Sequence, residues 1–198
     1  MPQAPEDAIV TIYNDLNGRI RRDDTFKVLE VSSTALILPP LKASKKTKSF
    51  IKFAQEFADE SGYLSATKSG DIYKSNNGRF RIDYFDVIRS HKTKRVVKTP
   101  ARISQITGKI EVSAEEFRRY TIPMRMAILL HEYSHYYLNK NPSNESEADL
   151  NGLRLYLQLG YPKIDIYNVF LNVFKSSPSL QNKARYEKLD KLVKNFKR

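Results

Sequence analysis

The sequence predicts an α+β fold, in which a twisted, mostly antiparallel sheet with helices precedes a helical C-terminal part. Two observations lead to this prediction. Short apolar segments separated by turn residues fill residues 63–106, which is the pattern of successive strands. From Ser113 onward, apolar residues recur at helical spacing. We expect residues 1–46 to form an N-terminal arm or strand region and residues 47–198 the main domain, both within one compact unit.

The first elements follow from apolar patterns and chain-breaking residues. Phe26–Leu38 has the character of a strand, which Pro39 ends. Lys42–Lys48 is basic and is expected to be a loop. Phe50–Ser61 carries phenylalanines at helical spacing and stops at Gly62, which predicts a helix.

Strands are expected next, separated by turns at Gly70 and at residues 76–78. Phe80–Phe85 and Ala101–Ile106 are strand candidates, and Gly108–Val112 alternates between apolar and polar residues as a strand does. Short and long helices should follow. Ser113 and Glu116 have capping-box spacing for the first of these helices. The expected helices of this part, apart from the two described next, span Ala114–Tyr120, Ile164–Phe174 and Ser179–Phe196.

The most informative motif is HExxH, at His131-Glu132-Tyr133-Ser134-His135. On a helix, residues four apart share a face, so both imidazoles can reach one metal ion. Glu132 would project beside that ion and can take a proton from water. Pro123 suits the first turn of this helix, and the apolar run Ala127–Leu130 predicts that the helix is buried. The alternative is an exposed helix with incidental histidines.

A second helix is expected after the turn at residues 139–143. Asn144 is a good N-cap, and Glu147 stands three residues later as a capping-box partner. The helix should end at Leu159, just before Gly160.

Acidic residues cluster near the start of this second helix. Glu145 and Asp149 are four residues apart and therefore share a face. Glu147 points about 200° away from Glu145 around the helix, so both cannot face one ion. Glu147 is an alternative metal ligand, and its capping role also explains its presence. Acidic residues are common at helix starts in any protein, so a purely structural role is the alternative for Glu145, Glu147 and Asp149.

HExxH followed by Glu-x-x-x-Asp on the next helix resembles the gluzincin zinc metallopeptidases. Residues 144–149 are especially similar to the minigluzincin and HtpX/Ste24-like branches. The resemblance implies a zincin-like fold and a Zn²⁺ cofactor, with His131, His135 and Glu145 as ligands. It implies Glu132 as the general base. It further implies that Asp149 hydrogen-bonds a ligand histidine, and such a carboxylate fixes the imidazole tautomer.

A peptidase of this kind also needs a substrate-binding strand and an oxyanion stabiliser. Zincins place an edge strand beside the cleft, where substrate peptide can add as a further strand. The two segments Phe80–Phe85 and Ala101–Ile106 are both candidates for that strand. The oxyanion candidates are Tyr161, Tyr167 and Arg185, and the sequence does not choose among them.

Composition limits the setting of the protein. Its 198 residues are enough for one domain with a core, and the absence of cysteine excludes disulfides and thiolate metal ligands. Residues 1–10 lack the features of a signal peptide, and apolar runs such as Ala35–Leu41 are too short to cross a bilayer. We therefore expect a cytoplasmic or virion location and no membrane partner, unlike the membrane-embedded HtpX/Ste24-like enzymes.

The net charge of +12 is concentrated in clusters. Such clusters can meet nucleic acid phosphates or acidic neighbouring subunits, and the alternative is a solvated basic surface. His91 lies inside the third cluster and is expected to be a surface residue. The clusters are Arg19, Arg21 and Arg22; Lys42, Lys45, Lys46, Lys48 and Lys52; Arg89, Lys92, Lys94, Arg95 and Lys98; and Lys194, Lys197 and Arg198.

Two functions remain open at this point. The first is a zinc-dependent peptidase with a peptide or protein substrate, which the presence of Glu132 favours because ligands alone would suffice for a structural metal. The second is a non-catalytic component of a bacteriophage virion, in a portal or tail assembly, that uses the fold as a scaffold among neighbouring subunits. A fold does not guarantee catalysis. The basic clusters favour this second function.

Overall fold

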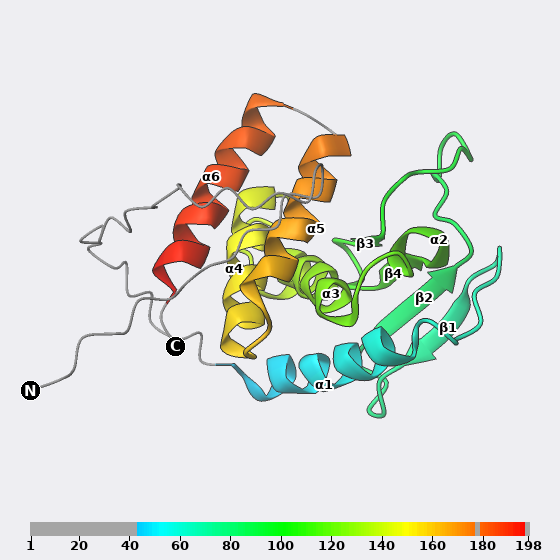
Figure 1. Cartoon of the computed structure of the whole chain (residues 1–198). Helices are drawn as coiled ribbons and strands as arrows, with labels where there is room; N and C mark the ends of the chain where they lie inside the picture. Colours follow the sequence, from blue (N-terminus) through cyan, green and yellow to red (C-terminus); the bar gives the residue numbers. More distant parts are fainter. Residues whose placement is uncertain (1–42, 177–178, 197–198) are drawn as a thin grey trace, which may run out of the picture. The chain divides into compact units, whose positions relative to one another are not determined.

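The computed structural model describes residues 43–176 and 179–196 (Figure 1). Within these residues, six helices and a four-stranded sheet confirm the α+β class. The helices are α1 (Lys45–Glu60), α2 (Ala114–Phe117), α3 (Ile122–Tyr137), α4 (Glu145–Gln158), α5 (Lys163–Ser176) and α6 (Leu180–Asn195). The strands are β1 (Asp71–Lys74), β2 (Arg81–Phe85), β3 (Ala101–Ile103) and β4 (Ile110–Ser113).

Several sequence-based expectations fall outside the described residues. They are the strand at Phe26–Leu38, most of the arm at residues 1–46, and the basic residues Arg19, Arg21, Arg22, Lys42, Lys197 and Arg198. Along the described part of the chain, none of the helices combines the length and the apolar character that a membrane span requires.

The start of α1 corrects the expectation of a basic loop at Lys42–Lys48. The helix begins at Lys45 rather than at Phe50, because Ser44 caps it and its hydroxyl accepts a hydrogen bond from the Thr47 amide at 3.1 Å. Lysine has a good helix propensity, so a basic segment can form a helical first turn when its side chains face solvent.

The sheet has the strand order β1-β2-β4-β3. β1 pairs antiparallel with β2, β3 pairs antiparallel with β4, and the central pair β2–β4 is parallel. The sheet is therefore mostly antiparallel, as expected. β1 and β3 are its edge strands, and β2 lies in its interior.

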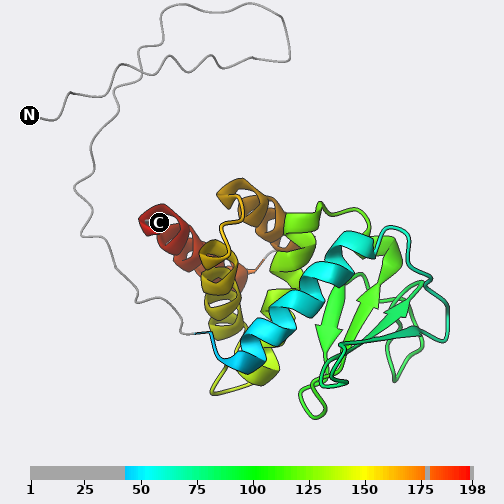
Figure 2. The ribbon, with the colours of Figure 1, turned by 90° about the horizontal axis from the view of Figure 1, so that it is seen from below.

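Helix α1 packs against both the sheet and α3, the helix that carries the HExxH motif (Figure 2). On α1, Phe57 meets Tyr84 of β2 edge-on with ring centroids 5.2 Å apart. Phe50 stacks on Tyr133 of α3 at 4.2 Å and meets Phe80 at 5.2 Å. These rings are buried and form the core on one face of the sheet. This packing holds α3 in a fixed position relative to the strands.

Candidate metal centre

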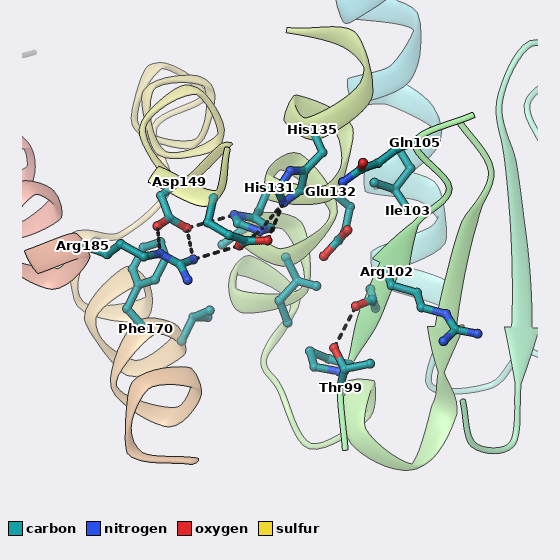
Figure 3. Close-up of a pocket in the computed structure, with 16 residues that line it drawn as sticks. Thr99, Arg102, Ile103, Gln105, His131, Glu132, His135, Asp149, Phe170 and Arg185 are labelled. Carbon is teal, nitrogen blue, oxygen red and sulfur yellow. Dashed lines mark hydrogen bonds and ion pairs between the residues drawn. The ribbon is translucent and has the colours of Figure 1, made fainter. Parts of the chain in front are cut away.

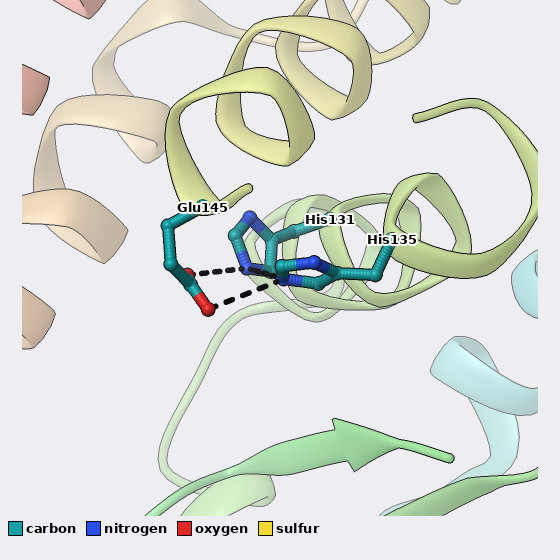
Figure 4. A group of neighbouring side chains, drawn as sticks. All are labelled: His131, His135 and Glu145. Atoms are coloured by element: carbon teal, nitrogen blue, oxygen red, sulfur yellow. Dashed lines mark hydrogen bonds and ion pairs between the residues drawn. The ribbon is translucent and has the colours of Figure 1, made fainter. Parts of the chain in front are cut away.

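Two neighbouring helices bring three polar side chains together. His131 and His135 lie one turn apart on α3, and Glu145 is the first residue of α4 (Figure 4). The start of α4 is fixed by Asn144, whose side chain accepts a hydrogen bond from the Glu147 amide at 3.1 Å. That cap was expected from the sequence, and it sets where the Glu145 carboxylate enters the site.

The atoms of this cluster lie close to the separations that one metal ion requires, with the two nitrogens slightly nearer to each other. The Nε2 atoms of His131 and His135 are 3.0 Å apart, and each lies 3.5 Å from an oxygen of Glu145. Ligands held about 2.0–2.2 Å from a tetrahedral ion lie about 3.3–3.6 Å from one another. Among the described residues, this is the one group of three such side chains that could hold a metal ion.

Groups behind the imidazoles orient both Nε2 atoms into the cluster. The Nδ1 of His135 donates to the carbonyl oxygen of Pro142 at 2.7 Å. The Nδ1 of His131 lies 3.0 Å from an oxygen of Asp149, which is buried on α4; the two atoms are close enough for an ion pair but are not aligned for a hydrogen bond. A partner on the distal ring nitrogen fixes the tautomer and the ring orientation of a metal-binding histidine.

Arg185 on α6 holds the two acidic residues of α4. Its Nε and Nη2 donate to the two oxygens of Asp149 at 2.6 and 2.9 Å, and Nη2 also donates to Glu145 at 3.1 Å. The side chain of Arg185 is only 13% exposed, so this is a buried, bidentate ion pair. The C-terminal helix is thereby connected to the cluster.

The electrostatics of the cluster favour a positive charge. Burial lowers the pKa of His131, but the carboxylates of Asp149 and Glu145 raise it more, to about 10. The contact with His131 lowers the pKa of Glu145. Burial raises the pKa of Asp149, yet His131 and Arg185 lower it further, so the shift is downward. A site that stabilises an imidazolium this strongly also suits a metal cation in its place.

Glu132 faces the same pocket from the next position on α3 (Figure 3). Burial raises its pKa, the charges of His131 and His135 lower it, and the net direction is upward. The nearby backbone of Ile103 on β3 also lowers the pKa of Glu132. A raised pKa makes a carboxylate a better proton acceptor.

The pocket has a volume of about 380 Å³ and lies between α3 and the edge strand β3. Two segments were candidates for the edge strand that binds substrate. Ala101–Ile106 contains β3, which is an edge strand, whereas Phe80–Phe85 contains β2, which lies in the interior of the sheet. On β3, the bonds from Ser113 N to Pro100 O and from Ser104 N to Lys109 O direct even-numbered residues toward β4. The backbone groups of Ala101 and Ile103 therefore point to the open edge.

The remaining candidate residues lie away from the histidines. A carboxylate oxygen of Glu147 accepts from the Lys140 amide at 3.0 Å. The hydroxyl of Tyr161 accepts a bond from Gln55, and that of Tyr167 donates to Asp190. None of these three lines the pocket, whereas Arg185 does.

Gln105 and Pro142 are parts of the site that the sequence did not indicate. The Gln105 side chain lines the pocket, and its Nε2 donates to the Pro142 carbonyl at 3.2 Å, the same oxygen that His135 contacts. A carbonyl is present at every residue, so no side-chain pattern could have indicated it. The lone Gln105 belongs to no recognisable motif.

The close approach of α4 to α3 depends on Gly152. A Cβ at this position would lie 2.9 Å from the backbone nitrogen of His131. Gly152→Ala should therefore push α4 away from His131 and lower the free energy of unfolding by about 1–3 kcal/mol. Alanine's better helix propensity offsets only about 0.5–1 kcal/mol of this. Urea unfolding of the metal-free protein measures the change.

Gly62 provides the matched control, because a Cβ there meets nothing within 4 Å. Gly62→Ala should leave the unfolding midpoint unchanged or slightly higher. Equal stability of the Gly152→Ala and Gly62→Ala proteins would contradict the tight packing of the two helices.

Comparisons with protein-family models, with curated proteins and with solved structures found no match. The functional interpretation therefore depends on the geometry of the site itself: two imidazole nitrogens and a carboxylate that converge, a second carboxylate in the same pocket, and an open strand edge beside them.

Proposed function

We propose that the protein is a zinc-dependent peptidase of the gluzincin type, with His131, His135 and Glu145 as the metal ligands. The single observation that carries this proposal is the convergence of these three side chains at separations of 3.0–3.5 Å. Two imidazoles and one carboxylate form a donor set that zinc favours in catalytic sites with an open fourth position. Glu132 in the same pocket supports catalysis over a purely structural ion.

The chemistry divides between the ion and the chain. A zinc ion bound there supplies Lewis acidity, which polarises a peptide carbonyl and makes water more acidic. Glu132 then accepts a proton from the attacking water and donates it to the nitrogen of the departing amine. Its raised pKa suits both steps, because the carboxylate must gain and then lose a proton. Asp149 and Pro142 keep the imidazoles oriented throughout.

The pocket also supports an extended peptide as the substrate. The backbone groups of Ala101 and Ile103 point to the open edge of β3, where a substrate strand can pair with them. The Ala101 carbonyl already accepts from the Thr99 hydroxyl at 2.8 Å, which leaves its amide for such pairing. Val169 and Phe170 of α5 form an apolar wall across the pocket, suited to an apolar side chain.

Metal removal tests the proposed function directly. The purified protein should bind one equivalent of zinc and cleave unstructured peptides; a chelator should abolish the cleavage, and added zinc should restore it. His135→Ala should lose the stoichiometric zinc, while His91→Ala should keep it. His91 is the matched control, because its exposed side chain lies on the loop between β2 and β3.

Metal analysis together with cleavage separates the candidate functions. Zinc retained by the His135→Ala protein would refute the ligand assignment. Stoichiometric zinc without cleavage of any peptide in a random library would refute the peptidase and favour the non-catalytic virion scaffold.

A further inference from the structure

We propose that the face of the sheet opposite α1, together with the loop between β2 and β3, binds the phosphate backbone of a nucleic acid duplex. The two arms of this loop, residues 86–100, pair with each other, and we call it the hairpin. We call the sheet face and the hairpin together the basic face. Its cations come from two places, the strands and the hairpin. They are Lys74, Arg79, Arg81, Arg102 and Lys109 on or beside the strands, and Arg89, Lys92, Lys94, Arg95 and Lys98 on the hairpin.

The strand alternation creates the first half of the basic face. Ile82 and Tyr84 of β2 are buried in the core against α1, so Arg81 and Asp83 project on the other side. In register with them, Lys74 lies opposite Arg81, and Glu111 of β4 lies opposite Asp83. One face of this sheet is thus apolar, and the other is mainly charged, with Ile72 and Phe85 as its apolar residues.

The acids of this face are already neutralised within it. Arg81 donates to both oxygens of Asp83 at 2.6 and 3.1 Å. Lys109 lies 3.1 Å from Asp83 and 3.3 Å from Glu111, and Arg102 donates to Glu111 at 2.7 Å. Both carboxylates are under 10% exposed. The segment 71–112, which contains all ten cations, has four acids in total, Asp71, Asp83, Asp86 and Glu111, and therefore carries a net charge of +6 of the chain's +12.

The hairpin extends the basic face outward. Val97 N donates to Ile88 O at 2.9 Å and Ser90 N to Arg95 O at 2.8 Å, which pairs its two arms. It projects from the sheet at the upper right of Figure 1. Within the described part of the chain, its five Lys and Arg side chains are exposed and no ion pair is found for them. Arg102 connects the hairpin to the sheet by donating to the Arg89 carbonyl at 3.0 Å.

A polar pocket of about 430 Å³ lies on the basic face. The side chains of Arg79, Arg81 and Lys109 line it, together with two hydroxyl donors. Guanidinium groups bind phosphate oxygens in a bidentate manner, and lysine adds a point charge. The hydroxyl donors are Ser104 and Thr107, and His91, Gly108 and the ion-paired Glu111 also line the pocket.

A duplex fits this surface better than an acidic protein or a single strand. Lysine is depleted from the cores of protein–protein interfaces, whereas lysines make up half of these ten cations. Single-strand binding relies on aromatic side chains that stack on bases. The exposed large apolar residues of β1 and of the hairpin are Ile72 and Val96, and neither is aromatic. A two-stranded β-ribbon can also enter the major groove.

The basic face is distinct from the metal pocket. The two share β3, and Arg102 also lines the metal pocket, but its side chain points away from the histidines, as Figure 3 shows. Binding of a duplex therefore requires neither the metal nor Glu132, and the two proposals can fail separately.

Fluorescence anisotropy of a labelled 30-base-pair duplex with the full chain tests the proposal. Replacing Lys92, Arg95 and Lys98 together by glutamine should weaken binding at least about tenfold at low salt. The slope of the logarithm of the binding constant against the logarithm of the salt concentration should also become shallower by up to about 3, about one for each lost phosphate contact. The matched control replaces Lys45, Lys48 and Lys52 of α1 by glutamine, which removes the same charge from the other side of the sheet.

The outcomes are distinguishable. Weaker binding by the hairpin variant alone, equal for two duplexes of unrelated sequence, would support the proposal. Equal loss in both variants would overturn it, because only net charge would then matter. Tighter binding of poly-glutamate than of the duplex would overturn it in favour of an acidic protein partner. Unchanged thermal unfolding midpoints verify that both variants are folded.

Discussion

Glu132→Gln is expected to reduce peptide cleavage by about 100- to 10,000-fold, which is the usual contribution of a general acid–base group. Glutamine has nearly the same shape as glutamate but cannot accept and return a proton. The three proposed ligands are untouched by this change, so the zinc content should stay at one equivalent. Metal analysis and cleavage rates measured on the same preparation test both halves of the prediction.

Glu147→Gln is the matched control for this experiment. It makes the same chemical change on α4, where the Glu147 carboxylate accepts from the Lys140 amide outside the pocket. Its cleavage rate should equal that of the unmodified protein. A fully active Glu132→Gln protein would remove Glu132 from the mechanism, and loss of zinc on Glu147→Gln would reopen the question of the third ligand.

Arg185→Met is expected to have the largest effect on stability. It leaves the buried Asp149 carboxylate without its bidentate partner, and breaking a buried ion pair from one side costs about 3–5 kcal/mol. We expect about 3 kcal/mol, the lower end of that range, because His131 still faces Asp149. Glu145 also loses a donor, so zinc affinity should fall as well. Urea unfolding with a chelator isolates the first effect, and a zinc titration measures the second.

The control for Arg185 is Lys194→Met on the same helix. Lys194 pairs with Asp190 at 2.8 Å, but its side chain is 69% exposed, so its loss should not change the unfolding midpoint measurably. If Arg185→Met unfolded at the same urea concentration as Lys194→Met, the proposed role of the buried pair would be wrong.

Local signals predicted much of the fold. Asn144 caps α4 as its residue type and position suggested, and Pro123 lies in the first turn of α3 as expected, although its cap, Thr121, was not identified. The start of α1 was missed because a run of lysines resembles a loop when Ser44 is not recognised as a cap. The parallel pairing of β2 with β4 was also beyond the sequence, since apolar alternation does not specify which strands become neighbours.

The site was predictable only where its parts lie on adjacent helices. The shared face of His131 and His135 follows from helix periodicity, whereas Glu145 was expected from the resemblance to a family; the structure brings these three together. Arg185 lies 36 residues beyond Asp149, and its position depends on how α6 packs. No local pattern reports that packing. For the same reason, the sequence offered three equivalent oxyanion candidates, of which the structure brings only Arg185 to the pocket.

The position of Ile103 has a consequence for where a peptide would be cut. Its amide points to the open edge of β3, and its backbone lies near enough to Glu132 to lower the pKa of that carboxyl. A peptide paired with this edge, as proposed above, would therefore run alongside Glu132. The register of the pairing would then decide which of its bonds is hydrolysed.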